Sequence, residues 1–286
     1  MKNVLPIGFT FNGEKHRTFE VNRIDGFMER VIHNETMMAE KPQTWMAMVI
    51  AGLLAEIEGK VVSSDFVASD GKKIPEIVKH IPLPDAGVIL TVAHAETFGS
   101  VLKAQKSKCS NCGRQNMQDV DLAALPVPEI DPAADIIDTL TVKLESGWKR
   151  ILDSSKAGQH PLGWEDKTFD EFTFGVPTIG DALRNERMYL ASRLLDFQVK
   201  MVNDRLIKVR DSKANFDMPQ DMFEAYKAGN MFFADRGGLY ANDRKLIRDA
   251  INQLPQIDLR VPVLCDNCSR EYDSGVSYAS FFPLVS

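Results

Sequence analysis

The chain has 286 residues, of which 44% are hydrophobic and 26% charged, and its formal net charge is −6. This composition is typical of a globular protein with a sizeable core and argues against a disordered chain. The negative charge, with no basic stretch, disfavours nucleic-acid binding, which relies on concentrated positive charge. The most apolar run, residues 45–55, is shorter than the roughly 20 residues that span a bilayer. The N-terminus also lacks a secretory signal, so membrane and secreted proteins are disfavoured, and we expect one large or two ordinary domains.

The first half of the chain predicts a β-hairpin followed by helices. Residues 4–21 read as two strands around a turn. Helical patterns follow at residues 26–38, 43–57, 84–93 and 96–106. Pro42 suits the start of the second of these helices, since its fixed φ is helical and its missing N–H is not needed there.

The second half begins after a connector. Residues 125–138 (LPVPEIDPAADIID) are rich in proline and acidic residues, which predicts an extended segment. Residues 140–144 alternate like a strand, and we expect a turn at Ser146-Gly147 to pair residues 148–152 back onto it. Residues 169–176 predict another strand. Helices are expected at 179–199 and 242–254, followed by an extended stretch at 258–264.

The four cysteines of the chain form two Cys-X-X-Cys pairs, in KCSNCGRQ and LCDNCSRE. This spacing lets a tight turn direct two thiolates at one ion, so Cys109, Cys112, Cys265 and Cys268 predict a Cys₄ site for a structural zinc ion. Iron also binds four thiolates, although zinc is favoured in a structural setting. Two alternatives stay open, namely disulfides and free, redox-active dithiols.

The two cysteine pairs also point to an internal repeat. Each half reads as a β-hairpin, then helices, then a Cys-X-X-Cys turn, although identity is low and chance similarity is an alternative. We therefore expect an α+β fold of two similar lobes, each ending in a zinc knuckle and related by a possible pseudo-twofold axis. The expected domains are residues 1–124, a connector at 125–138, and residues 139–286. The zinc ion would then fasten one lobe to the other.

Motifs typical of catalysis are missing from the sequence. It has no phosphate-binding glycine loop, no GxSxG and no HExxH. His94 and Glu96 could form an acid–base pair, but two residues apart on a helix they point away from each other. Asp85 and Asp243 each precede a helical run and read as N-caps. Four thiolates fill a zinc ion and leave no position for water, so we expect no enzyme, no catalytic residue and no cofactor besides zinc.

Aromatic residues gather near the C-terminus, in GVSYASFFPLVS. Phe281 and Phe282 could pack within this protein or anchor a neighbouring subunit, because aromatics dominate interface cores. The segment 231–240 (MFFADRGGLY) leaves the same two possibilities.

Several of these motifs resemble one family. The knuckle and strand CSNCGRQNMQDVDLAAL, the helix DRKLIRDAINQL leading into LRVPVLCDNCSREY, and FTFGVPTIGDAL are similar to baseplate hub and tail-assembly proteins of T-even-type contractile-tailed bacteriophages. The resemblance implies a non-catalytic structural protein of the virion tail baseplate, present in the host cytoplasm during assembly. It implies many copies in a symmetric assembly, with tube, spike, hub or wedge proteins as partners and neither nucleic acid nor membrane. The metal-binding role carries over to the four cysteines, while the presence of two knuckles departs from the family pattern.

Three other functions remain as alternatives. The first is a tail assembly chaperone that is absent from the mature virion. The second is a zinc-ribbon adaptor or regulator that binds nucleic acid or a polymerase, for which Lys103, Lys106, Lys108 and Arg114 would supply the basic face. The third is a thiol oxidoreductase that uses its Cys-X-X-Cys pairs.

Overall fold

The computed structural model describes residues 3–62, 74–125, 135–149, 167–187, 200–234 and 238–276. It is a mixed α+β structure, which confirms the predicted class, and it divides into two compact units. Unit 1 comprises Met1–Ile136, Thr178–Leu183 and Pro255–Ser286, and unit 2 comprises Ile137–Pro177 and Arg184–Leu254.

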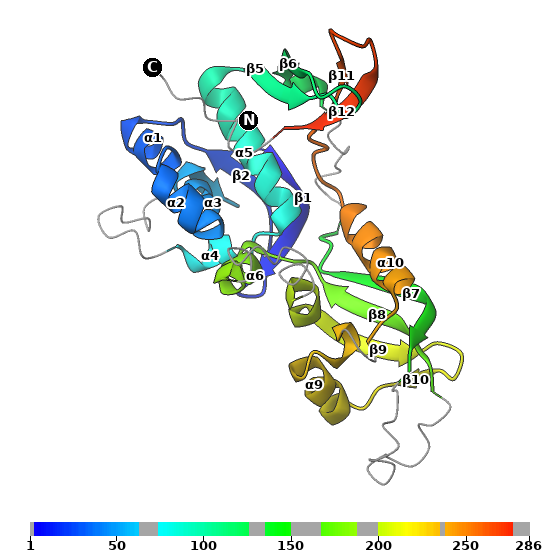
Figure 1. Cartoon of the computed structure of the whole chain (residues 1–286). Helices are drawn as coiled ribbons and strands as arrows, with labels where there is room; N and C mark the ends of the chain where they lie inside the picture. The colour runs from blue at the N-terminus through cyan, green and yellow to red at the C-terminus, as the bar shows by residue number, and fades with distance from the viewer. Residues whose placement is uncertain are drawn as a thin grey trace. The chain divides into compact units, whose positions relative to one another are not determined.

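Unit 1 contains an antiparallel sheet of order β1-β2-β3-β4, with one face against helix α5 (Figure 1). The strands of this sheet are β1 (Asn3–Phe11), β2 (Glu14–Val21), β3 (Leu54–Ile57) and β4 (Lys60–Val61). The helices are α1 (Gly26–Ile32), α2 (Glu35–Glu40), α3 (Pro42–Leu53), α4 (Glu76–Lys79), α5 (Leu83–Phe98) and the start of α6 (Ile179–Arg184), with a 3₁₀ turn at Leu122–Ala124. Two further hairpins complete the unit, namely β5 (Val101–Lys108) with β6 (Gln115–Asp121), and β11 (Arg260–Leu264) with β12 (Glu271–Gly275).

Helix α3 is the centre of the unit 1 core. Eight of its twelve residues are buried, because other helices and the sheet cover it on several sides. Pro42 occupies the first turn as predicted, and the indole nitrogen of Trp45 donates to the carbonyl of Ile32 over 3.0 Å. The apolar run that is too short for a membrane span is thus a buried helix of a globular core.

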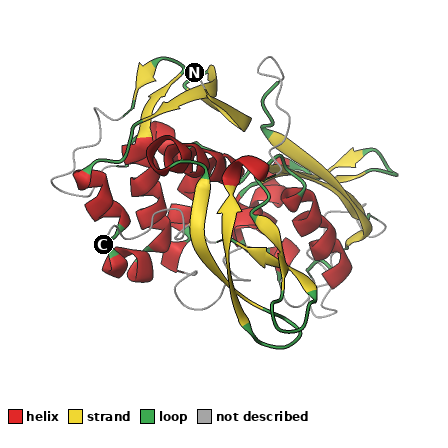
Figure 2. Ribbon diagram, turned by 90° about the horizontal axis from the view of Figure 1, so that it is seen from above, coloured by secondary structure: helices red, strands yellow, loops and turns green. Residues whose placement is uncertain are grey.

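Unit 2 has a sheet of the same topology, order β10-β9-β8-β7, with its own aromatic core. Its strands are β7 (Thr139–Trp148), β8 (Phe169–Gly175), β9 (Leu206–Asp211) and β10 (Phe216–Asp217), and its described helices include α9 (Gln220–Ala228), a 3₁₀ turn (Met231–Phe233) and α10 (Ala241–Asn252). Figure 2 distinguishes these short sheets and hairpins from the helices by colour. Phe232 contacts Trp148 and Phe172 edge-on, with ring centroids 5.0 and 5.6 Å apart. Such pairs stabilise a core beyond their buried area.

Two predicted helices of the first half have different bounds in the structure. The helix expected at 26–38 breaks into α1 and α2, because the side chain of Asn34 caps a new helix by accepting from the N–H of Met37. The helix expected at 43–57 ends at Leu53, since Leu54–Ile57 pair with β2.

The helix expected at 96–106 is wrong. Helix α5 runs without interruption to Phe98 and stops at Gly99, whose φ of 86° is outside the helical region. Residues from Val101 onward form β5 and pair with β6 across the first cysteine turn. Long-range pairing has therefore overridden the local helical pattern.

The turn expected at Ser146-Gly147 is also wrong. Strand β7 continues through Gly147 to Trp148 and pairs with β8, and Gly147 forms part of a bulge. The helix expected at 179–199 is α6 as far as Arg184, and residues 188–199 lie outside the described residues. Phe281 and Phe282 also lie outside them, as do residues 126–134 of the connector.

The two halves of the chain share one order of elements. In each, a four-stranded sheet with the first strand at its edge is followed by a helix (α5 or α10) and then by a hairpin that carries a Cys-X-X-Cys turn. Duplication of an ancestral lobe stays a prediction. The compact units differ from the expected domains, because the second hairpin belongs to unit 1.

Candidate metal site

The four cysteines lie together in unit 1. Cys109 and Cys112 occupy the turn between β5 and β6, and Cys265 and Cys268 occupy the turn between β11 and β12. Their sulfur atoms all lie within 4.8 Å of one another. The Sγ atoms of Cys112 and Cys265 are 3.5 Å apart, and those of Cys109 and Cys268 are 3.8 Å apart. This group could therefore hold a metal ion between the two hairpins.

The two turns have the same backbone hydrogen bonds. The N–H of Cys109 donates to the carbonyl of Arg114 and that of Gly113 returns to the carbonyl of Cys109, both over 2.9 Å. In the second turn, Cys265 donates to Arg270 over 3.0 Å and receives a bond from Ser269 over 2.9 Å. Gly113 and Ser269 have positive φ values of 73° and 52°. Each segment, Cys109–Gly113 and Cys265–Ser269, is called a knuckle below.

Hydrogen bonds of polar side chains connect the two hairpins close to the knuckles. The hydroxyl of Tyr272 on β12 lies 2.7 Å from the hydroxyl of Ser107 and accepts from the amide of Asn116 over 2.9 Å. The amide oxygen of Asn116 in turn accepts from the N–H of Asp266 over 3.1 Å. Asn116 is buried, so its hydrogen bonds carry more weight than those of a surface amide.

Hydrogen bonds to sulfur favour the thiolate form at the second knuckle. The N–H of Cys268 donates to the sulfur of Cys265 and, with other donors, lowers the pKa of Cys265 to about 6. The side-chain amide of Asn111, on the opposite knuckle, lowers the pKa of Cys268. Because the thiolate is the metal ligand, these donors prepare the site for a cation.

The arrangement fits a tetrahedral thiolate site. Zinc binds cysteine sulfur at about 2.3 Å, which places the sulfurs of a tetrahedron about 3.8 Å apart. Two of the six sulfur–sulfur separations, 3.5 and 3.8 Å, are close to this value, and the other four are no longer than 4.8 Å. The donor set is soft, and four protein ligands leave no position for water or substrate.

The site joins two hairpins of one unit, whereas the sequence led us to expect a link between two lobes. The C-terminal segment Pro255–Ser286 returns to unit 1, where Ile257 and Val276 enter the apolar core. Apolar burial thus places the second hairpin beside the first, in addition to any metal.

The structure also places the predicted acid–base pair and the basic residues near the first knuckle. His94 is buried in α5 whereas Glu96 is exposed, so the structure does not bring them together. Of the basic residues near the first knuckle, Lys103 pairs with Asp119 over 2.7 Å. This ion pair reduces the positive charge that a nucleic-acid interface would need.

Asp85 and Asp243 are not N-caps. Each is the third residue of its helix and is fully buried. Asp85 accepts from the N–H groups of Ile7 and Gly8, both over 2.9 Å, and Asp243 accepts from Glu145 and Ser146 over 3.0 and 3.2 Å. Sequence reasoning missed this role, although the recurrence of both residues at matching places was a signal.

Comparisons of the chain with protein-family models, with curated proteins and with solved structures give no match. Among the described residues, no helix is both long and apolar enough to cross a membrane.

Proposed function

We propose that this protein is a non-catalytic structural component of a contractile phage tail baseplate hub, in which a zinc ion bound by Cys109, Cys112, Cys265 and Cys268 fastens two hairpins. The zinc assignment rests on one observation, the convergence of four sulfurs from two matched knuckles to within 4.8 Å of one another. A closed Cys₄ site stabilises structure and has no open position for chemistry. The baseplate assignment rests on the resemblance of the knuckle and helix motifs.

The binding free energy of a structural zinc ion is large. A structural zinc site contributes about 10–16 kcal/mol of binding free energy in small peptides, which is comparable with the roughly 5–15 kcal/mol net stability of many domains. The hairpins β5–β6 and β11–β12 contact each other through a few polar side chains. The ion would add to these contacts, and to the burial of Ile257 and Val276, in holding the second hairpin beside the first.

The metal assignment is tested by elemental analysis and thiol titration of protein purified under reducing conditions. We expect one zinc per chain and four thiols that react only after chelation. Cys112→Ser should abolish stoichiometric zinc, whereas Ser110→Ala, a matched control in the same turn, should retain it. A metal-free chain with four reactive thiols would contradict the proposal and favour the redox alternative.

The baseplate assignment is tested by quantitative mass spectrometry of tail particles purified from cells that make this protein. A fixed number of copies per particle would support a structural role. A protein required for assembly but absent from particles would be the chaperone instead. Salt-dependent binding to DNA by the purified protein would favour the adaptor alternative.

A further inference from the structure

Each hairpin of the metal site has an outer face that points away from the other hairpin. Ser107, Asn116 and Tyr272 lie between the hairpins, where their side chains contact one another. Neighbouring residues of a strand point to opposite sides, so the residues beside these three, and those paired with them, form the outer faces. The outer residues are all exposed, and they are Lys106, Lys108, Gln115 and Met117 on the first hairpin and Pro262, Leu264, Glu271 and Asp273 on the second.

The outer face of the first hairpin is basic. Residues 101–121 carry four cations and two aspartates, a net charge of +2. One of these cations, Lys103, is neutralised by Asp119 over 2.7 Å. Lys106 and Lys108 form no ion pair with any carboxylate that the structure describes. The end of this face next to the knuckle therefore presents two unpaired amines.

The same face of the second hairpin is acidic. Residues 258–275 carry four carboxylates and two arginines, a net charge of −2. The guanidinium of Arg260 is held by the carboxylate of Asp258 over 2.9 and 2.7 Å, and Asp273 acts on it only at longer range. Glu271 has no ion pair within the described ranges of the chain. The two outer faces are thus alike in strand register and opposite in charge.

Each outer face also exposes one large apolar side chain. Met117 is 62% and Leu264 is 65% exposed, against 37% for Phe98, the other exposed large hydrophobic residue in the described part of unit 1. Met117 is paired with Lys106 and Leu264 with Glu271. A single exposed apolar residue needs no partner, but these two lie beside the unpaired charges.

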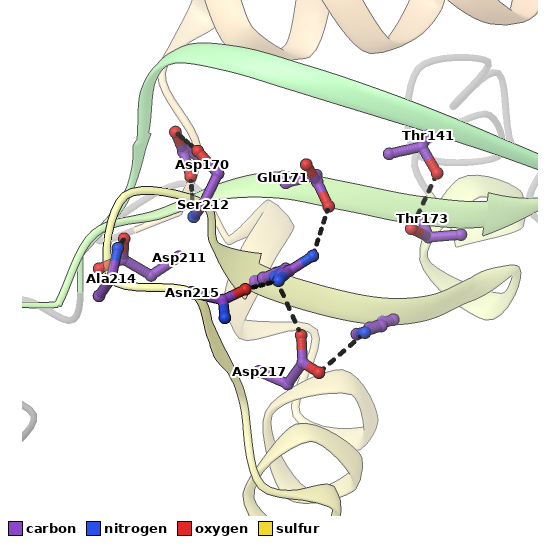
Figure 3. Close-up of polar contacts among 11 residues, drawn as sticks. Thr141, Asp170, Glu171, Thr173, Asp211, Ser212, Ala214, Asn215 and Asp217 are labelled. Carbon is purple, nitrogen blue, oxygen red and sulfur yellow. Dashed lines mark hydrogen bonds and ion pairs between the residues drawn. The ribbon is translucent and has the colours of Figure 1, made fainter.

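Charges on the unit 2 sheet are arranged differently. Arg210 lies 3.5 Å from Asp217 and 4.0 Å from Glu171, and Lys208 lies 2.9 Å from Asp217 (Figure 3). Opposite charges on neighbouring strands thus satisfy one another within one sheet, as is usual for a solvated face. On the hairpins, the charges of opposite sign are instead separated onto two faces that point away from each other.

We propose that the outer face of the first hairpin binds the outer face of the second hairpin in another copy of this chain. The two lysines of one copy would meet the two carboxylates of the next, and Met117 would pack against Leu264. Complementary charge favours such an encounter. Nucleic acid is a poorer fit to the basic face, because phosphates would lie against Met117 and the acidic face would have no role.

The contact is head to tail. Because the outer faces of one copy point away from each other, a copy cannot offer both of them to the same neighbour. Every bound pair keeps one basic and one acidic face free, so the contact can be repeated until a ring closes. A contact between two short hairpins is at the small end of interface sizes, so we expect weak, salt-dependent association. Each face is formed by strand pairing within one hairpin, and the proposal needs neither zinc nor the baseplate assignment.

Sedimentation velocity of the full-length protein tests the contact. The sedimentation coefficient should rise with protein concentration up to about 1 mM, and association should weaken at least about tenfold between about 0.05 M and 0.5 M salt. Lys106→Glu combined with Lys108→Glu should abolish self-association, and so should Glu271→Lys combined with Asp273→Lys. A mixture of these two double variants should form a 1:1 complex, because the first keeps an intact acidic face and the second an intact basic one.

A charge change elsewhere is the control. Lys245→Glu combined with Arg248→Glu alters the net charge of the chain as much as the first double variant does, at exposed positions of α10, and should associate like the wild type. A chain that stays monomeric, double variants that associate like the wild type, or duplex DNA bound at the two lysines of a monomeric chain would each overturn the proposal. A metal-free protein that still associates through these faces would contradict only the zinc assignment.

Discussion

Ser269 and Gly113 hold equivalent places in the two knuckles, and both need a positive φ. A left-handed conformation costs an L-residue about 1–2 kcal/mol, whereas glycine adopts it freely but loses more entropy on folding. We expect Ser269→Gly to raise the free energy of unfolding of the metal-bound protein by up to about 1 kcal/mol, measured by denaturant titration. Ser269→Ala still places an L-residue at a positive φ, so the free energy of unfolding should change little. A destabilised glycine variant would mean that the serine hydroxyl is needed there.

Asp85 makes the stability of unit 1 depend on pH. Burial raises the pKa of its carboxyl to about 7, against the lowering effects of the Ile7 and Gly8 N–H groups and of Arg17. A carboxyl whose folded pKa is raised stabilises the fold fully below its unfolded value, near 4, and this contribution is lost as pH rises through about 7. We therefore expect unfolding midpoints of unit 1 to fall between pH 4 and pH 7.

The same residue gives a mutational test. Asp85→Asn should flatten this pH dependence and lower the free energy of unfolding by about 1–3 kcal/mol. The amide oxygen can accept from only one of the Ile7 and Gly8 N–H groups, and the other N–H is left without its partner. Glu96→Gln, on an exposed position of the same helix, is the control and should keep the wild-type profile. An unchanged profile in Asp85→Asn would show that another group controls the titration.

At the scale of elements, the contact between the hairpins depends on Tyr272. Its hydroxyl meets Ser107 and the buried Asn116. Tyr272→Phe keeps the ring but removes these hydrogen bonds. We therefore expect the free energy of unfolding to fall by about 1–2 kcal/mol and zinc to transfer faster to a chelator. Tyr240→Phe, at an exposed tyrosine, should have no effect. Equal chelation rates in both variants would mean that the polar network does not support the metal site.

The elements also show what sequence can and cannot predict. The knuckles were predictable because Cys-X-X-Cys spacing constrains the local backbone, and their meeting followed from the donor set. The pattern of residues 96–106 predicts a helix because it does not contain the partner strand β6, whose pairing fixes Val101–Lys108 as strand β5. The bulge at Gly147 looked like a turn because glycine serves both, and only the register with β8 separates them.

At the scale of the whole molecule, neither compact unit is a continuous stretch of the chain. Unit 1 is assembled from three segments of the chain, while the larger part of unit 2 is inserted between the second and the third. The bounds that we expected from the sequence followed chain order and so assigned the second knuckle to the second lobe. Burial of Ile257 and Val276 in the unit 1 core is a long-range effect that composition and periodicity do not reveal.

This connectivity predicts how the molecule responds to loss of metal. Unit 2 has its own apolar core around Trp148 and Phe232 and none of the cysteines. We expect a chelator to increase hydrogen exchange in β5, β6, β11 and β12, because these hairpins lose their shared ion, while β7, β8 and β9 keep their protection. Readdition of zinc should restore the slow exchange. Uniform loss of protection in both units would show that they unfold together and that the ion stabilises the whole chain.

A chain that ends at Leu254 separates the two contributions of the C-terminal segment. It lacks Cys265 and Cys268 and also the core residues Ile257 and Val276, whereas the double variant Cys265→Ser with Cys268→Ser lacks the ligands alone. We expect both to lose zinc but the truncated chain to have the lower thermal midpoint for unit 1, since burying each aliphatic side chain contributes about 1.5–3 kcal/mol. The near-ultraviolet circular dichroism from Trp148 should persist in both. Equal midpoints would mean that the ion, rather than apolar burial, holds the segment in place.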